Sequence, residues 1–296
     1  MSAARARGAW PAPEALVRAQ REARARAERV RLVVHQARGR TGASLGRGAG
    51  DSVEYEDHRS FVPGDDPRHV DWNAYARSGQ WVAKVFRAEV TPAVDLAFDA
   101  SASMAAWPGK AACALGLFYL ALEGARRVAA SVRVHVLVGP ALETPPLDAV
   151  DAGRWLPATP GDDAPPELGR VPWRPGSLRI WVSDLLFVGA PSGHLAPLGR
   201  AAGRAAVLVP HAVEESAPEW QGNLTLVDPE SGAQRIQRVS PRLLERYHEA
   251  YQQHFAALRD AGRRLGIPVA RVAAEGDLLA ALRTEALPAG VFEPCR

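Results

Sequence analysis

Cysteine and long apolar runs are both scarce in this sequence. The only two cysteines, Cys113 and Cys295, cannot build a disulfide framework or the paired spacing of a zinc site. No apolar run is long enough to span a bilayer, and the basic N-terminus lacks the apolar core of a secretory signal. We therefore expect a cytoplasmic protein with no transmembrane segment.

Lysine is also scarce, because 34 of the 36 basic residues are arginine. Residues 1–50 hold 11 arginines and three glutamates, a net charge of +8. Since the whole chain carries +3, residues 51–296 carry −5. The basic character thus belongs to the N-terminal segment, and the rest is mildly acidic. We do not expect nucleic acid to be the main partner, and binding through the arginine-rich N-terminal arm is kept as an alternative.

The chain divides into three segments by composition and pattern. Residues 1–50 combine a basic amphipathic helix, expected over 14–37, with a glycine-rich linker. Residues 51–90 alternate short extended stretches with turns, and we expect this signature segment to pack on the sheet that follows. Residues 91–290 alternate strands and helices and form the main domain.

The main domain has the pattern of an α/β fold. Apolar and capping patterns predict strands at 93–98, 131–138, 178–182, 206–210 and 267–272. Helices are predicted near 109–129, 193–203, 241–265 and 277–286. A β-hairpin is expected over 223–239. Strands separated by helices predict a mostly parallel sheet with helices on both faces.

Two oxygen-rich clusters follow strands of this sheet. Asp99, Ser101 and Ser103 lie between a strand and a helix, and Asp184 ends another strand. Ligands of open parallel sheets bind beyond the carboxyl ends of the strands, and hard oxygen ligands suit Mg²⁺. A Mg²⁺ (or Mn²⁺) with few anionic ligands would accept a carboxylate from a partner. The simpler alternative, that Asp99 and the serines only cap the following helix, stays open.

The Asp-x-Ser-x-Ser pattern resembles the metal-ion-dependent adhesion site of von Willebrand factor A-like domains. Over roughly residues 45–288 the chain resembles the bacterial domain-of-unknown-function family fifty-eight, through "YEDHRSFVPGDDPRHVDWNAYARSGQWVAKVFRAEV", "DLAFDASASM", "WVSDLL" and "LTLVDPESG". The resemblance implies a von Willebrand factor A-like, Rossmann-type α/β fold and a non-enzymatic, metal-dependent protein-interaction module. It also implies a MoxR-type AAA+ ATPase as partner, in a chaperone-like or assembly role. Many relatives have N-terminal membrane helices, and we expect this chain to be a soluble variant.

The metal ligands carry over from this resemblance residue by residue. Asp99, Ser101 and Ser103 match the first loop, and Asp184 matches the later aspartate. The threonine usual between them is best matched by Thr159, with Asp162 and Asp163 as substitute oxygen donors. This stretch is short and proline-rich where such domains usually place helices. The ion could therefore bind to the isolated protein or only when a partner supplies further ligands.

The signature segment carries a second set of charged residues. Two roles are open for them: a buried polar network that ties the segment to the sheet, or a partner surface. We favour the structural role, because turns rich in aspartate often satisfy their own backbone. The residues are Asp65, Asp66, Arg68, Asp71 and Arg77.

An enzymatic role is the remaining alternative. A metal-dependent hydrolase could use the same strand-end oxygens, but no histidine flanks either cluster to serve as general base. The Gly-x-Ser-x-Gly pattern of serine hydrolases and the glycine pattern of a P-loop are both missing. We therefore expect a binding protein rather than an enzyme.

Overall fold

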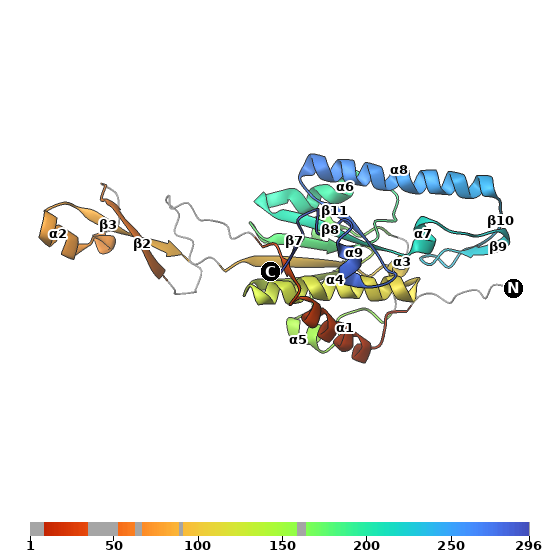
Figure 1. The fold of residues 1–296 in the computed structure, drawn as a ribbon, viewed down its shortest axis with the longest axis horizontal. Coiled ribbons are helices and arrows are strands. Elements are labelled where there is room, and N and C mark those ends of the chain that lie inside the picture. The colour runs from red at the N-terminus through yellow and green to blue at the C-terminus, as the bar shows by residue number, and fades with distance from the viewer. Residues whose placement is uncertain (1–8, 35–52, 63–66, 89–90, 159–163, 296) are drawn as a thin grey trace. The chain divides into compact units, whose positions relative to one another are not determined.

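The computed structural model describes five stretches of the chain, residues 9–34, 53–62, 67–88, 91–158 and 164–295. The chain forms two compact units (Figure 1). The core unit comprises Met1–His35 and Pro92–Arg296, and the signature unit comprises Gln36–Thr91. Each unit is described by itself below.

A six-stranded sheet forms the centre of the core unit. Its strands, in spatial order, are β11 (Val269–Ala273), β8 (Arg204–His211), β7 (Leu178–Val182), β4 (Ala93–Asp99), β5 (Ser131–Val138) and β6 (Ala141–Glu143). All neighbours pair in parallel except β5 and β6, which are antiparallel. The expected mostly parallel α/β sheet is thus confirmed.

Helices cover both faces of this sheet, as predicted (Figure 1). The helix α4 (Pro108–Arg127) packs on one face in a core that includes Leu96 and Phe98 of β4. On the other face, α8 (Pro241–Leu265) packs in a core that includes Ala97 of the same strand. Consecutive residues of β4 face opposite layers, and a strand covered on both sides reads as a continuous apolar run.

Shorter elements complete the core unit. They are α1 (Pro13–Arg26), β1 (Val30–Leu32), α3 (Ala102–Ala105), α5 (Leu147–Asp151), η2 (Leu168–Arg170), α6 (Pro191–Leu195), η3 (Ala196–Ala202), α7 (Val213–Ser216), β9 (Gly222–Val227), β10 (Gln234–Val239), α9 (Leu278–Leu282) and β12 (Phe292–Pro294). No helix of the described ranges is both long and apolar enough to cross a membrane.

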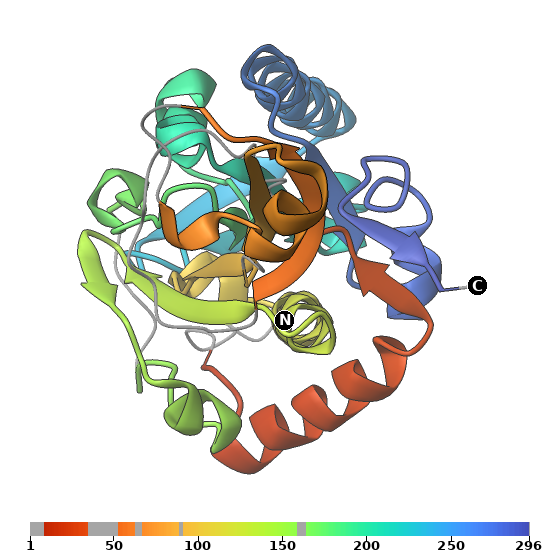
Figure 2. The same cartoon turned by 90° about the vertical axis from the view of Figure 1, so that its left-hand side faces the viewer.

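The N-terminal helix is shorter than predicted. The expected helix over 14–37 ends at Arg26, and the chain then turns into β1, which pairs antiparallel with β12 (Figure 2). Val30 lies in this strand rather than on a helix face, because β-branched residues favour strands when a pairing edge is available. The alanine stripe of α1 packs against α4, with Leu16 and Ala23 buried.

The helix α8 has the bounds that its sequence predicts. The Ser240 side chain accepts a hydrogen bond from the amide of Leu243, and Gly266 ends the helix with a φ of +67°. Tyr251, Phe255 and Leu258 of the predicted apolar stripe are buried. Tyr247 and Leu265 of that stripe are exposed, because they lie near the ends of the helix.

The signature unit pairs β2 (Val53–Ser60) antiparallel with β3 (Val82–Ala88), and η1 (Pro67–His69) and α2 (Trp72–Ser78) lie between these strands in the chain. The buried Asp71 caps α2, because its Oδ1 accepts hydrogen bonds from the amides of Asn73 and Ala74, both at 3.0 Å. Arg68 and Arg77 are exposed, and Arg77 donates to the Asn73 carbonyl. Asp65 and Asp66 lie outside the described residues. The packing of this unit on the sheet stays a prediction.

Candidate metal centre

The predicted site lies where two neighbouring parallel strands end. Asp99 is the last residue of β4, and Asp184 follows the end of β7 by two residues. The hydroxyl of Ser183 donates to Asp99 Oδ2 at 2.7 Å, which joins the two strand ends directly. Asp99, Asp184 and Ser183 are all buried. The structure therefore brings together the two aspartates that the sequence places after separate strands.

Asp99 is fully buried and fixed through both carboxylate oxygens. Its Oδ1 accepts a hydrogen bond from the Ser101 amide at 3.0 Å, and its Oδ2 accepts the bond from Ser183. Burial and the neighbouring charge of Asp184 raise the pKa of Asp99 to about 7, against the opposing effect of these hydrogen bonds. A buried carboxylate of this kind is stabilised in its ionised form by a nearby cation.

Ser101 and Ser103 present a pair of hydroxyls beside this carboxylate. Their Oγ atoms lie 3.1 Å apart and share a hydrogen bond, in which either hydroxyl can donate. Adjacent ligands of an octahedral Mg²⁺, each about 2.1 Å from the ion, lie about 3.0 Å apart, so this spacing suits the ion. Ser101 occupies the N-cap position of α3, but its side chain makes no capping hydrogen bond. The helix-capping alternative therefore does not account for its hydroxyl.

Asp184 is paired with a buried lysine. Lys110 Nζ on α4 donates to Asp184 Oδ2 at 2.8 Å and to Glu215 Oε1 at 2.5 Å. Although burial by itself disfavours the charged ammonium, the two carboxylates outweigh it and raise the pKa of Lys110 above its ordinary value. The ammonium thus stays charged and already neutralises part of the acidic cluster.

The loop after β7 holds the Asp184 carboxylate by local hydrogen bonds. The Leu186 amide donates to Asp184 Oδ1, and the Leu185 amide donates to Ser183 Oγ, both at 3.1 Å. Leu185 is fully buried and has a φ of +57°, a conformation uncommon for residues other than glycine. Such backbone strain often marks a functional site, and here it lies directly beside a predicted ligand.

A further carboxylate reaches the site from the β9–β10 hairpin. Glu230 Oε1 accepts a hydrogen bond from the Ser103 amide at 2.7 Å, and its Oε2 accepts one from the Ala102 amide at 3.0 Å. Burial raises the pKa of Glu230 above its ordinary value, and the hydrogen bonds from Ser103 and Ala102 oppose this.

Sequence reasoning found the hairpin but missed the role of Glu230, and it also missed Lys110 and Glu215. Lys110 had one usable signal, since it is a lysine in an arginine-rich chain and lies at the start of an apolar helix. Glu230 lies within the quoted stretch "LTLVDPESG". Neither signal shows which residue the side chain meets.

The side chains present suit a hard divalent cation. The cluster holds four carboxylates, those of Asp99, Asp184, Glu215 and Glu230, and one ammonium, which pairs with Asp184 and Glu215; an excess of three negative charges remains when all are ionised. Hydroxyl and carboxylate oxygens are the ligands that Mg²⁺ prefers. Within the described residues, no group of three or more His, Cys, Asp or Glu side chains is arranged to hold a metal ion. An ion here would therefore depend on the serine hydroxyls, water and other ligands.

The structure does not test the predicted threonine ligand. Thr159 lies outside the described residues, and so do Asp162 and Asp163. Their roles as ligands stay predictions.

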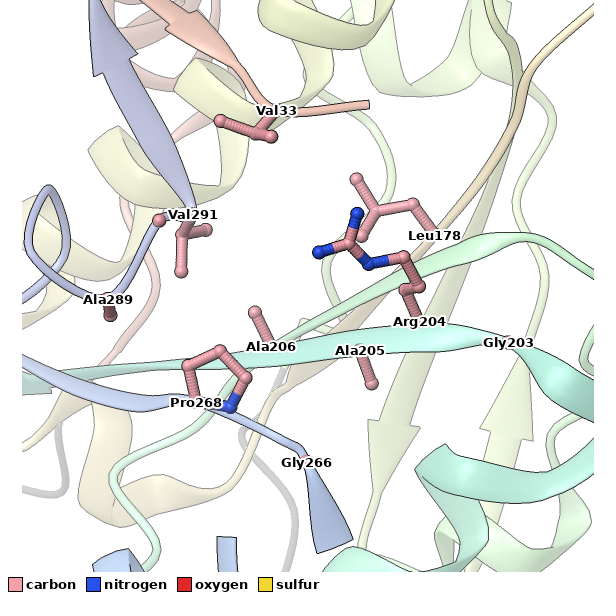
Figure 3. Close-up of a pocket in the computed structure, with 11 residues that line it drawn as sticks. Val33, Leu178, Gly203, Arg204, Ala205, Ala206, Gly266, Pro268, Ala289 and Val291 are labelled. Carbon is pink, nitrogen blue, oxygen red and sulfur yellow. The ribbon is translucent and has the colours of Figure 1, made fainter. Parts of the chain in front are cut away.

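A cavity of about 210 Å³ lies away from this site, at the amino ends of the strands (Figure 3). Leu178, Ala206 and Pro268 line it from the sheet, and Val33 and Val291 line it from the chain termini. Among the described residues that line it, Arg204 is the one charged residue, and none carries a carboxylate, hydroxyl, thiol or imidazole. Its lining offers few groups for chemistry, so the carboxyl-end cluster is the better candidate site.

Comparison with known proteins supports the family resemblance over part of the chain. The model of a family described as "Protein of unknown function DUF58" matches residues 57–130. This range includes Asp99, Ser101, Ser103 and Lys110. None of the curated proteins matches the chain.

Two solved structures from Bacteroides species show weak similarity. The conserved hypothetical protein BatB from Bacteroides thetaiotaomicron is 16% identical, with a TM-score of 0.31, over 67% of this chain and 98% of that protein. An aerotolerance-related membrane protein from Bacteroides fragilis is 14% identical, with a TM-score of 0.29, over 60% of this chain and 99% of that protein. At these scores neither match supports a conclusion about fold or function.

Proposed function

We propose that this protein is a non-enzymatic protein-binding module with a von Willebrand factor A-like fold. In this proposal, Asp99, Ser101, Ser103 and Asp184 hold Mg²⁺ or Mn²⁺, and the ion binds a carboxylate of the partner. The observation that carries the proposal is the pair of serine hydroxyls 3.1 Å apart, beside two buried aspartates at the ends of adjacent parallel strands.

The residues of the site would have different roles in holding such an ion. Ser101 and Ser103 would supply neutral oxygen ligands, which leave the ion its attraction for a further anion. Asp99 and Asp184 would supply negative charge, while Lys110 and the Ser183 hydroxyl fix their positions. The bound ion would supply an electrophilic centre for a partner's acidic side chain.

The partner that we propose is a MoxR-type AAA+ ATPase, in a chaperone-like or assembly role. This choice depends only on the sequence resemblance. Its test is retention of the purified MoxR-type ATPase of the same organism on the immobilised full chain, in the presence of Mg²⁺. We expect the parent to retain the ATPase and the double variant Ser101→Ala/Ser103→Ala to lose it.

The matched control for this experiment is Ser192→Ala, which removes an exposed hydroxyl from α6. This control should retain the ATPase as the parent does. Equal retention by the parent and the Ser101/Ser103 variant would contradict binding through the site. Loss of retention by all three proteins alike would exclude the ATPase as partner.

The hydrolase alternative gains no support from the contacts of the site. The hydrogen-bond partners of Asp99 and Asp184 are serine hydroxyls, backbone amides and the Lys110 ammonium. None of these is a histidine, and the further carboxylate of the site, Glu230, is held by the amides of Ala102 and Ser103.

A further inference from the structure

The Glu230 carboxylate lies beside Ser103, one of the proposed metal ligands. Its two oxygens accept hydrogen bonds from the amides of Ala102 and Ser103, the first two residues of α3. Ser103 also carries one of the two hydroxyls of the candidate metal centre. The charge of Asp184 is among the causes that raise the pKa of Glu230, after burial, and also among those that raise the pKa of Asp99.

The hairpin tip is built to hold Glu230 in this position. Asp228 Oδ1 accepts a hydrogen bond from the Glu230 amide at 3.0 Å, and Asp228 Oδ2 accepts one from the Ser231 hydroxyl at 2.6 Å. Gly232 closes the turn with a φ of +71° and donates its amide to the Asp228 carbonyl at 2.8 Å. The backbone at Glu230 is therefore ordered by the turn itself, independently of the contact that its side chain makes.

The two strands of the hairpin differ in exposure. The β10 strand is mostly exposed, with Ile236 at 81% exposure, and Val239 at its end is the residue of that strand that is buried. The hairpin strands pair with each other and form a separate two-stranded sheet. In β9, by contrast, Leu224, Leu226 and Val227 are half-buried, so opening the hairpin would cost this apolar burial as well as the two hydrogen bonds of Glu230.

We propose that Glu230 is an internal substitute for the partner's carboxylate, so that the β9–β10 hairpin closes the site until an acidic segment of a partner displaces it. This inference depends on the proposed binding function. In this inference the partner's carboxylate binds the amides of Ala102 and Ser103 as well as the ion. Two carboxylates cannot occupy the same pair of amides, because their charges repel each other and each amide has one hydrogen to donate. Binding of the partner and docking of the hairpin tip are therefore mutually exclusive.

The probe for this inference is a labelled peptide with the sequence of residues 226–234, LVDPESGAQ. We expect the full-length Glu230→Ala variant to bind it at least about ten-fold more tightly than the parent, because the internal competitor is gone. The same peptide with Gln in place of its Glu should bind neither protein measurably. The control variant Glu249→Gln, changed on the exposed side of α8, should bind like the parent.

Hydrogen exchange of the full chain supplies the second measurement. Amides of residues 222–239 should exchange faster in Glu230→Ala than in the parent or in Glu249→Gln. Faster exchange together with unchanged peptide affinity would overturn the inference, because the hairpin would then open without exposing a binding position. Unchanged exchange would overturn it as well, since Glu230 would not be what holds the tip.

Metal binding at the site and displacement of Glu230 by a partner can each fail independently of the other. If Glu230→Ala gains peptide affinity equally with Mg²⁺ and with chelator, the internal-substitute inference stands and the metal part of the proposed function fails. If Mg²⁺ binds in a manner that requires Ser101 and Ser103, but Glu230→Ala gains no peptide affinity, the proposed function stands and this inference fails.

Discussion

Lys110 is the single side chain on which the charge balance of the site most depends. It is fully buried and makes ion pairs with Asp184 and Glu215. A buried ion pair adds little net stability compared with an apolar pair, but removing one partner leaves the others uncompensated. Lys110 is thus a structural requirement of a site whose other charged members are acidic.

The Lys110→Met variant should be strongly destabilised. Removing the ammonium leaves two carboxylates buried without a counter-charge, and we expect a loss of about 3–5 kcal/mol in the free energy of unfolding. Urea unfolding measures this directly. The control Arg127→Met, at the exposed end of the same helix, should change the free energy by less than about 0.5 kcal/mol. A comparable loss in both variants would show that the Lys110 ion pairs have no special weight.

His211 should make the protein less stable in acid. Its pKa is lowered to about 4, chiefly by burial and then by the positive charge of Arg271. Between its ordinary pKa of 6.5 and about 4, the unfolded state binds the proton and the folded state does not. The free energy of unfolding therefore falls as the pH drops through this window, by about 2 kcal/mol after allowance for partial solvent exposure.

Asp99 has the opposite dependence, so the His211 effect must be isolated by a variant. Because the pKa of Asp99 is raised to about 7, its contribution to stability is lost as the pH rises from its ordinary value towards 7. We expect His211→Leu to remove the acid-side loss, so that the stability difference between the variant and the parent grows from pH 7 to pH 4. A difference independent of pH, in urea unfolding at several pH values, would rule out His211 as the source.

At the scale of elements, close approach between helices and strands depends on particular glycines of α4. A Cβ atom at Gly124 would lie 2.8 Å from the Cβ of Leu32 in β1, next to the backbone of that strand. A Cβ atom at Gly116 would instead meet the Cδ2 tip of Leu278 at 3.0 Å, and this tip can rotate away. Both glycines are buried in α4, but a side chain at Gly124 would meet a strand, whereas one at Gly116 would meet the tip of a leucine side chain.

We therefore expect opposite results from one substitution at these two glycines. Gly124→Ala should lower the free energy of unfolding by about 1–2 kcal/mol, because the forced shift of β1 outweighs the gain in helix propensity. Gly116→Ala should be neutral or raise it by up to about 1 kcal/mol. Thermal and urea unfolding of both variants provide the measurement, and destabilisation of the same size in both would contradict this account of β1 packing.

Elements with strong local signals were predictable from the sequence. The strands Ser131–Val138 and Leu178–Val182 and the helix Pro241–Leu265 have the predicted bounds, because apolar runs and caps define them locally. The N-terminal helix was predicted too long, because β1 forms only by pairing with β12 at the far end of the chain. Local patterns carry no information about such a partner.

The residues of the candidate site also divide into those that local sequence patterns predict and those that depend on distant contacts. Asp99, Ser101, Ser103 and Asp184 could be selected because each follows a strand of a recognisable parallel sheet. Lys110, Glu215 and Glu230 reach the site from a helix, a short turn of helix and a hairpin tip. Their convergence depends on tertiary packing, which single-sequence periodicity does not encode.

At the scale of the whole molecule, the basic N-terminal segment is partly built into the core unit. Gln20 and Arg24 of α1 donate hydrogen bonds to the buried Glu123 of α4, each at 3.0 Å. Leu16 of α1 is 1% exposed and belongs to the same core as the sheet. The segment over 13–26 is therefore a packed helix, and binding of nucleic acid by its exposed arginines stays a prediction.

Urea unfolding of the intact chain tests whether the packing of α1 stabilises the core unit. We expect Leu16→Ala to lower the free energy of unfolding by about 2–4 kcal/mol, through lost burial and the cavity left beside α4. Arg18→Ala, on the exposed side of α1, should change it by less than about 0.5 kcal/mol. An unchanged midpoint for Leu16→Ala in urea unfolding would mean that α1 contributes nothing to the core.

Calorimetric titration of Mg²⁺ into the chelator-treated full chain tests the central claim most directly, with the Ser101→Ala/Ser103→Ala double variant beside it. These substitutions remove the paired hydroxyls without adding or removing a buried charge. The account predicts saturable binding to the parent, binding to Ser192→Ala at the same affinity, and none to the double variant. Indistinguishable titrations of the parent and the double variant would contradict a metal centre built on these serines.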